Sequence, residues 1–194
     1  MKRLSLFFSL LFATVFTVSA QQTDINRPQT SASVGMTPIQ QGNWMIGGGI
    51  GSLGYSFEAE SFNINVVPRA GYFVSDGVAV GLGVDLGFST RSGDQDNIWG
   101  YGVAPFVRYY FPKGASATGR FFGQGEVGIA GSSVGSGADL KFGINAGYAH
   151  FITESVALEA MVGYNYSKGT VANATALSGL GASLGFQIYL PGQR

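Results

Sequence analysis

The chain has 194 residues with eleven basic and eleven acidic side chains, a formal net charge of zero, and no cysteine. The absence of cysteine excludes disulfide bonds and a lipid-modified N-terminal cysteine, and the charge balance, with no basic patch, argues against nucleic acid as a partner. Only 11% of the residues are charged and 45% are hydrophobic, whereas a soluble domain carries about 25% charged residues. The length suits one domain, and the composition favours an outer surface that meets lipid.

Residues 1–20 have the pattern of a secretory signal peptide. Two basic residues precede an apolar run that extends to about Val18, and small residues occupy the cleavage positions up to Ala20. The run is too short to cross a bilayer as an ordinary helix, so a retained N-terminal anchor is the weaker alternative. Residues 21–42 are polar and unpatterned, which predicts a flexible lead-in. No other candidate transmembrane helix follows, so strands must make any membrane crossing.

Residues 62–88 predict a β-hairpin around a tight turn at residues 75–77. In both arms bulky apolar side chains alternate with small or polar ones, as Val84 does with Gly83 and Asp85. Because successive strand side chains point to opposite faces, each arm has one apolar face and one small or polar face. In a chain with so few charges, the apolar face is predicted to meet lipid and the other face to line the inside of a barrel.

The same period of two recurs in eight segments. They cover residues 43–53, 62–74, 78–89, 99–111, 121–131, 140–148, 156–166 and 180–190. Segments of about ten residues suit tilted strands that cross a bilayer. Longer polar connections follow the odd-numbered segments and tighter turns follow the others, an asymmetry typical of an outer-membrane barrel with both mature termini in the periplasm. The predicted fold is all-β: an eight-stranded antiparallel transmembrane up-and-down β-barrel over residues 43–190, with a short tail at 191–194.

The predicted lipid-facing sides carry no Asp, Glu, Lys or Arg. A lipid-facing Arg or Lys costs about 2–4 kcal/mol at the bilayer midplane, so this absence supports the assigned faces. Aromatic residues gather toward the segment ends, as expected for two interfacial girdles. Those near the tight turns are Tyr72, Tyr109, Phe111, Phe121 and Tyr148, and those near the longer loops are Phe62, Phe88, Trp99, Tyr101, Phe142, Tyr164 and Tyr166.

The run VPRAGYFVSDGVAVGL at residues 67–82 is similar to the P-x-x-G-Y-F-v-x-D-x-x-A-v-G pattern of small OmpA-like and OmpX-like proteins. The last segment, with Phe186 and Tyr189, resembles the aromatic assembly signal of such proteins, although four residues follow it here. Over about residues 43–190 the chain thus resembles the bacterial outer-membrane β-barrel domain family. The resemblance implies an outer-membrane location, a monomer, and outer-membrane lipids and the barrel-assembly machinery as partners.

Six charged residues fall on the predicted inner face. They are Arg69, Asp85, Arg108, Glu126, Lys141 and Glu159. They could line an ion path, or they could pair with one another and with inward amides (Asn65, Gln124, Asn145 and Gln187) to fill the lumen. An eight-stranded barrel is just wide enough for its own side chains, which favours a structural, lumen-filling cluster. Arg108 and Glu126 lie at similar distances from the turn that joins their segments, so an ion pair between them is predicted.

Motifs that carry chemistry in other proteins lack their context here. Residues 49–54 fit G-x-G-x-x-G, but another alternating segment follows instead of the helix that a dinucleotide site needs, so no cofactor is predicted. His150 is the single histidine, and an interfacial role is favoured over catalysis because a polar ring is ordinary at headgroup depth. With no cysteine and one histidine, no transition-metal site is predicted.

The sequence therefore predicts a non-enzymatic integral outer-membrane barrel with a filled polar interior. Its wall would support surface loops for envelope structure, adhesion or binding of a surface ligand. One alternative is a narrow porin-like channel for ions or small solutes. A less favoured alternative is a lipid-acting outer-membrane enzyme that uses His150 as its acid or base.

Overall fold

The structure, a computed structural model, describes residues 38–56, 61–90, 96–111, 118–134, 137–170 and 176–192. The predicted signal peptide at residues 1–20 and the lead-in up to residue 37 lie outside the described residues. In the described part of the chain, no helix has the length and apolar character needed to span a membrane.

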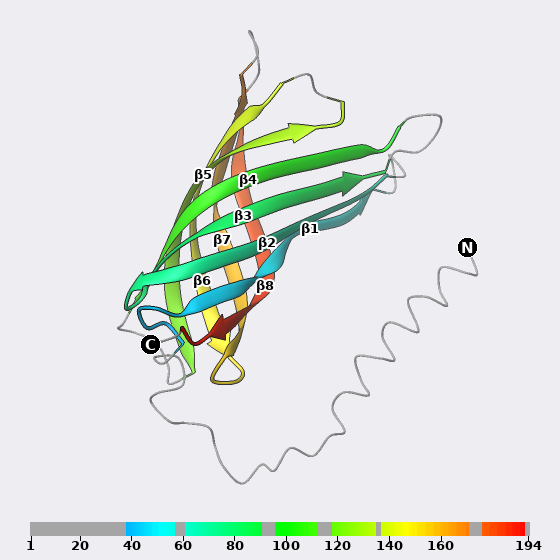
Figure 1. Cartoon of the computed structure of the whole chain (residues 1–194). Coiled ribbons are helices and arrows are strands. Elements are labelled where there is room, and N and C mark those ends of the chain that lie inside the picture. Colours follow the sequence, from blue (N-terminus) through cyan, green and yellow to red (C-terminus); the bar gives the residue numbers. More distant parts are fainter. Residues whose placement is uncertain are drawn as a thin grey trace, which may run out of the picture. The chain divides into compact units, whose positions relative to one another are not determined.

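Eight antiparallel strands close into a barrel in which each strand pairs with its sequence neighbours and β8 pairs with β1 (Figure 1). The strands are β1 (Trp44–Ser56), β2 (Ser61–Ser75), β3 (Val78–Ser89), β4 (Ile98–Tyr110), β5 (Gly119–Ser132), β6 (Asp139–Phe151), β7 (Val156–Gly169) and β8 (Ala176–Leu190). The predicted all-β, eight-stranded antiparallel up-and-down barrel is confirmed. The turn predicted at residues 75–77 joins β2 to β3, and Gly77 has a φ of 76°, a left-handed conformation that favours glycine.

Several strands extend further toward the loops than their apolar faces predict. The sequence predicts a loop over residues 167–176, but β7 continues to Gly169 and β8 begins at Ala176. Lys168 lies opposite Ala176 in the register of these two strands. Backbone pairing continues there without bulky apolar outward side chains, so alternation alone ends β7 too early and begins β8 too late.

The apolar faces point outward and the small or polar faces point inward, as predicted. Val84 and Leu86 are 37% and 50% exposed, whereas Gly83 between β3's outward residues is buried. At the opposite extreme, Arg108 is 0% exposed. Because the charged residues in the middle of the strands, such as Arg69, Arg108 and Glu159, point inward, the outer wall between the strand ends has the composition of a lipid-facing surface.

Aromatic rings pair on the outer wall near both ends of the strands. Toward the tight turns, the ring centroids of Trp44 and Tyr72 lie 5.0 Å apart, and those of Phe121 and Tyr148 lie 4.9 Å apart. Toward the longer loops, Phe88 and Trp99 lie 4.4 Å apart. This arrangement matches two interfacial belts, where an amphipathic ring can meet both hydrocarbon and water.

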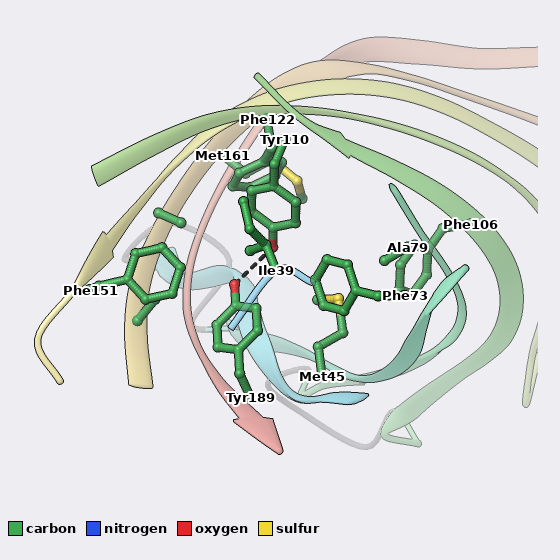
Figure 2. Packing of buried hydrophobic residues seen from close by; sticks show 12 residues of the cluster. Ile39, Met45, Phe73, Ala79, Phe106, Tyr110, Phe122, Phe151, Met161 and Tyr189 are labelled. Atoms are coloured by element: carbon green, nitrogen blue, oxygen red, sulfur yellow. Dashed lines mark hydrogen bonds between the residues drawn. The ribbon is translucent and has the colours of Figure 1, made fainter. Parts of the chain in front are cut away.

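The lumen at the tight-turn end is filled by apolar and aromatic side chains, whereas the sequence predicts a polar interior (Figure 2). We call this group the aromatic seal: Ile39, Met45, Phe73, Tyr110, Phe122, Phe151 and Tyr189. Each of them is at most 5% exposed. The seal closes the end of the barrel at which the even-numbered strands finish.

Ile39 enters the seal from the segment that precedes β1. The Gly77 N–H donates to the Ile39 carbonyl at 2.8 Å, and the Gly42 N–H donates to the Phe73 carbonyl at 2.9 Å. Residues 38–42 are therefore docked on the barrel end, which corrects the prediction of a flexible lead-in for these five residues. The physical reason is the burial of one apolar side chain in an otherwise polar segment, together with its backbone hydrogen bonds.

The barrel closes over only part of its length. β1 and β8 pair from Trp44 opposite Leu190 to Ile50 opposite Leu184. The pairing of β1 with β2 shifts between Ile50 and Ser52, so Gly51 forms a bulge. Bulges bend a strand and end its pairing, and here the bulge coincides with the end of the β1–β8 ladder.

Candidate functional site

The interior polar cluster takes one charged residue from each of six successive strands. Arg69, Asp85, Arg108, Glu126, Lys141 and Glu159 lie on β2 to β7 in that order, and all are buried or half-buried. The structure thus brings all six predicted site residues into the lumen. They divide into one fully buried ion pair, one half-buried ion pair and two residues without an ionic partner.

The fully buried pair joins Arg108 to Glu159 across the lumen. Nη1 of Arg108 donates to both carboxylate oxygens of Glu159, at 2.7 and 2.9 Å, and Nε donates to Oε1 of Gln124 at 2.9 Å. The guanidinium carbon also lies 4.1 Å from the centroid of the Phe122 ring. In this dry environment the pair is held in one geometry, because breaking it would leave a buried charge uncompensated.

The predicted ion pair between Arg108 and Glu126 is wrong, because Arg108 binds a different carboxylate. In the register of β4 and β5, Gln124 lies opposite Arg108, and Glu126 lies opposite Phe106. The carboxylate that binds Arg108 comes instead from β7, 51 residues further along the chain. A narrow barrel lets long side chains meet across the lumen as readily as along the wall, and counting from a shared turn cannot reveal such contacts.

The tyrosine hydroxyls of the aromatic seal connect it to this ion pair. Tyr110 accepts a hydrogen bond from Nη1 of Arg108 at 3.0 Å, and its hydroxyl lies 2.8 Å from that of Tyr189 (Figure 2). Both phenols therefore place their rings in the apolar layer and their oxygens against the charged layer. The sequence did contain a signal for this layer, because bulky aromatic residues occupy inner-face positions within a few residues of the tight turns.

The second ion pair lies nearer the loops and is more exposed. Nζ of Lys141 lies 2.7 Å from Oδ2 of Asp85, with the two side chains 33% and 19% exposed. Such a pair is screened by water and contributes less than a dry one.

Arg69 and Glu126 remain without an ion pair among the described residues. The Glu126 carboxylate accepts one hydrogen bond from the Gln124 amide at 2.8 Å. Arg69 is 9% exposed, and within the described part of the chain its guanidinium interacts with the carboxylates of Glu126, Glu159 and Asp85 at longer range, without a hydrogen bond or ion pair. Both line a polar cavity of about 220 Å³, together with Asp85, Lys141 and inward asparagines that include Asn65 and Asn145.

Of the amide side chains predicted to pair with the inner charges, some do so and others do not. Gln124 bridges Arg108 and Glu126 as expected. Gln187, however, is 1% exposed and neither polar atom of its side chain has a hydrogen-bond partner in the described structure, so its predicted pairing is wrong. In the strand register it lies opposite Gly47 on β1 and Ala157 on β7, neither of which offers a polar side chain.

The other candidate residues lie away from this cluster. His150 is exposed on the outer wall near the end of β6, with its ring 6.4 Å from that of Tyr148. The glycines of the G-x-G-x-x-G motif lie within β1 and lead to β2, which removes the context of a dinucleotide site. The described residues contain no group of three or more side chains that could hold a metal ion.

Comparison with known proteins gives matches by structure but not by sequence. No protein-family model matches the chain, and no curated protein matches it. Among solved structures, Neisserial surface protein A is similar over 76% of this chain and 97% of its own, with 17% identity and a TM-score of 0.54. The outer membrane protein OprG from Pseudomonas aeruginosa is similar over 79% of this chain and 98% of its own, with 11% identity and a TM-score of 0.50.

The chain has the fold of small outer-membrane β-barrels. At these identities the likeness concerns the fold alone, and it does not assign a ligand or an activity to this protein.

Proposed function

We propose that the protein is a non-enzymatic, monomeric barrel of the bacterial outer membrane whose rigid, sealed wall supports surface loops for envelope structure, adhesion or partner binding. It is exported through a cleaved signal peptide, folded by the barrel-assembly machinery, and has both mature termini in the periplasm. Outward apolar faces, paired aromatics near both strand ends and the likeness in fold support this location.

The sealed lumen is the observation that carries the proposal. The aromatic seal fills one end of the barrel, and the Arg108–Glu159 pair lies against it through the Tyr110 and Tyr189 hydroxyls. A solute would have to displace a packed apolar layer and separate a dry ion pair to pass. The recognition surface is therefore assigned to the loops and not to a pore.

Cell fractionation tests the location. The mature chain is expected to begin at Gln21, to sediment with outer membranes, and to migrate differently on a denaturing gel before and after boiling, because a closed barrel resists unfolding. Recovery of the mature chain in the soluble periplasm would overturn the proposal.

A pair of neighbouring substitutions in β3 tests the assigned faces. Val84→Arg places a charge on the lipid side, where it costs about 2–4 kcal/mol near the midplane and should reduce assembly into membranes. Gly83→Ser adds a small polar side chain inside, where its Cβ would meet only ordinary contacts, the nearest at 3.6 Å. Equal assembly yields for the two variants would contradict the assignment.

A narrow channel is the second candidate, and the polar cavity beside Arg69 and Glu126 is the observation that favours it. Conduction would require the aromatic seal to open. A lipid-acting enzyme is a weaker candidate, because His150 lies outside the polar cluster. If His150→Ala abolished a lipid hydrolase activity of the purified wild-type barrel, the non-enzymatic assignment would fail.

A further inference from the structure

The junction of β1 and β8 is open in the half of the barrel nearer the loops. Beyond Ile50 and Leu184, the rest of β1 pairs with β2, and β8 from Ala176 to Ser183 pairs with β7. In the described residues these two strand segments have no partner on their facing edges, and Figure 1 shows β1 and β8 diverging there. We call this gap the seam. Unpaired backbone groups are costly inside a membrane, so the seam needs an occupant with polar groups.

Two hollows of opposite polarity adjoin at the seam. One is the polar lumen cavity of about 220 Å³. The other is an apolar groove of about 870 Å³ that runs from Phe121 and Phe122 on β5 over β6, β7 and β8 to β1, and its outward residues include the small Ala146, Ala160 and Ala182. Gly51, Met161, Ala182 and Ser183 line both hollows. A molecule with a polar head and an apolar tail could therefore occupy both at once.

The charges in the cavity specify the head. Asp85 is paired with Lys141, and Glu159 with Arg108. Arg69 and Glu126 are the remaining cation and anion, and both line the cavity. A nine-tenths buried guanidinium without a hydrogen bond among the described residues is a strong site for an oxyanion. The carboxylate of Glu126 opposes a purely anionic ligand and favours one that also carries an ammonium group.

We propose that the seam binds a zwitterionic single-chain phospholipid, with its phosphate at Arg69, its ammonium at Glu126 and its acyl chain in the outer groove. One chain is inferred because one apolar groove adjoins the cavity at the seam. A second apolar groove, over β3 to β6, shares only Glu126 with the cavity and has no lining residue on β1 or β8. The ester, hydroxyl and phosphate oxygens of such a head also offer acceptors to the unpaired N–H groups of the seam. A second copy of the barrel could pair with the open edges, but it would leave Arg69 and Glu126 unmatched.

Native mass spectrometry of the full mature barrel, released from non-ionic maltoside micelles, tests the proposal. The probes are lysophosphatidylethanolamine, the anionic lysophosphatidylglycerol, and glycerophosphoethanolamine, which has the zwitterionic head but no tail. One lysophosphatidylethanolamine per barrel is expected, with weaker retention of the anionic lipid and no retention of the tailless head. Equal retention of the two lipids, retention of the tailless head, or a lipid-free dimer would each overturn the proposal.

Two charge variants test separately the proposed contacts of the phosphate and of the ammonium group of the lipid head. Arg69→Gln should weaken binding of both lipids by roughly tenfold or more, the effect of one charge-assisted hydrogen bond. Glu126→Gln should instead reverse the preference toward lysophosphatidylglycerol. Unchanged retention by Arg69→Gln would contradict the phosphate site.

A groove variant keeps the test valid if a lumen variant fails to fold. Ala182→Trp fills the apolar groove and should abolish retention of lysophosphatidylethanolamine. Ala70→Trp is the matched control, because Ala70 is an exposed alanine on the outer wall of β2, away from the groove residues. If both tryptophan variants bind the lipid like the wild type, the groove does not hold its tail and the proposal fails.

Discussion

The two halves of the lumen differ in how their space is filled and in how their charges are paired. In the half near the tight turns, the aromatic seal packs the lumen against the dry Arg108–Glu159 pair, and β1 pairs with β8. In the half near the loops, Arg69 and Glu126 face a polar cavity and the seam is open. We infer that the half near the tight turns contributes most of the stability and that the half near the loops offers the ligand chemistry.

The largest expected contrast is between the two ion pairs. Glu159→Ala leaves Arg108 as an uncompensated, fully buried charge, which should lower the free energy of unfolding by about 3–5 kcal/mol. Asp85→Ala breaks a half-exposed pair and should cost about 1 kcal/mol or less. Denaturant titration of the refolded barrel in lipid vesicles measures both values.

A double variant provides the control for this contrast. Arg108→Met with Glu159→Leu removes both charges and should recover most of the stability that the single change loses, since apolar replacement of a buried pair is often neutral. If Glu159→Ala and Asp85→Ala lowered the free energy of unfolding equally, the buried pair would contribute no more to stability than the more exposed one, and the proposed contrast between the two halves would fail.

The glycines of β3 provide a second contrast of intermediate size. A Cβ at Gly81 would overlap the Ala70 carbonyl and the Phe106 ring, whereas one at Gly83 would meet its nearest atom at 3.6 Å. Gly81→Ser should therefore cost about 1–3 kcal/mol by overpacking, and Gly83→Ser about 0.5 kcal/mol or less. Denaturant unfolding midpoints, compared at an unchanged denaturant dependence of the unfolding free energy, measure the difference. If Gly83→Ser cost more stability than Gly81→Ser, the tight packing would be assigned to the wrong position.

The smallest expected effect concerns the hydroxyl groups between the seal and the ion pair. Tyr110→Phe removes the oxygen that accepts from Arg108 and lies 2.8 Å from the Tyr189 hydroxyl, which should cost about 1 kcal/mol. Tyr72→Phe, on the exposed outer wall, is the control and should change stability by less. If the Tyr110→Phe barrel were as stable as the wild type, the Tyr110 hydroxyl would not stabilise the contact between the aromatic seal and the ion pair.

Much of the fold could be predicted from the sequence because one physical signal repeats in every strand. Residues such as Val84 and Gly83 alternate with a period of two, and the scarcity of charge decides which face is inside. The turn before Val78 followed from Gly77. Strand ends such as Gly169 and Ala176 were missed because backbone pairing continues beyond the bulky outward residues.

The site was predictable only as a set of inward residues. Alternation places Arg108 and Glu159 inside, but their contact depends on closure of the barrel, which brings β4 and β7 together across the lumen. The docking of Ile39 depends on a single apolar side chain in a polar segment. The seam depends on a bulge at Gly51, and a run of glycines carries no side-chain pattern that could reveal it.

Single-channel recording tests the sealed lumen most directly. The wild-type barrel in a planar bilayer should give no regular conductance steps, whereas Phe73→Ala combined with Tyr110→Ala should open a path through the seal and produce them. Stable, ion-selective steps from the wild-type protein, with selectivity altered by Glu126→Gln, would contradict a sealed lumen and favour a channel.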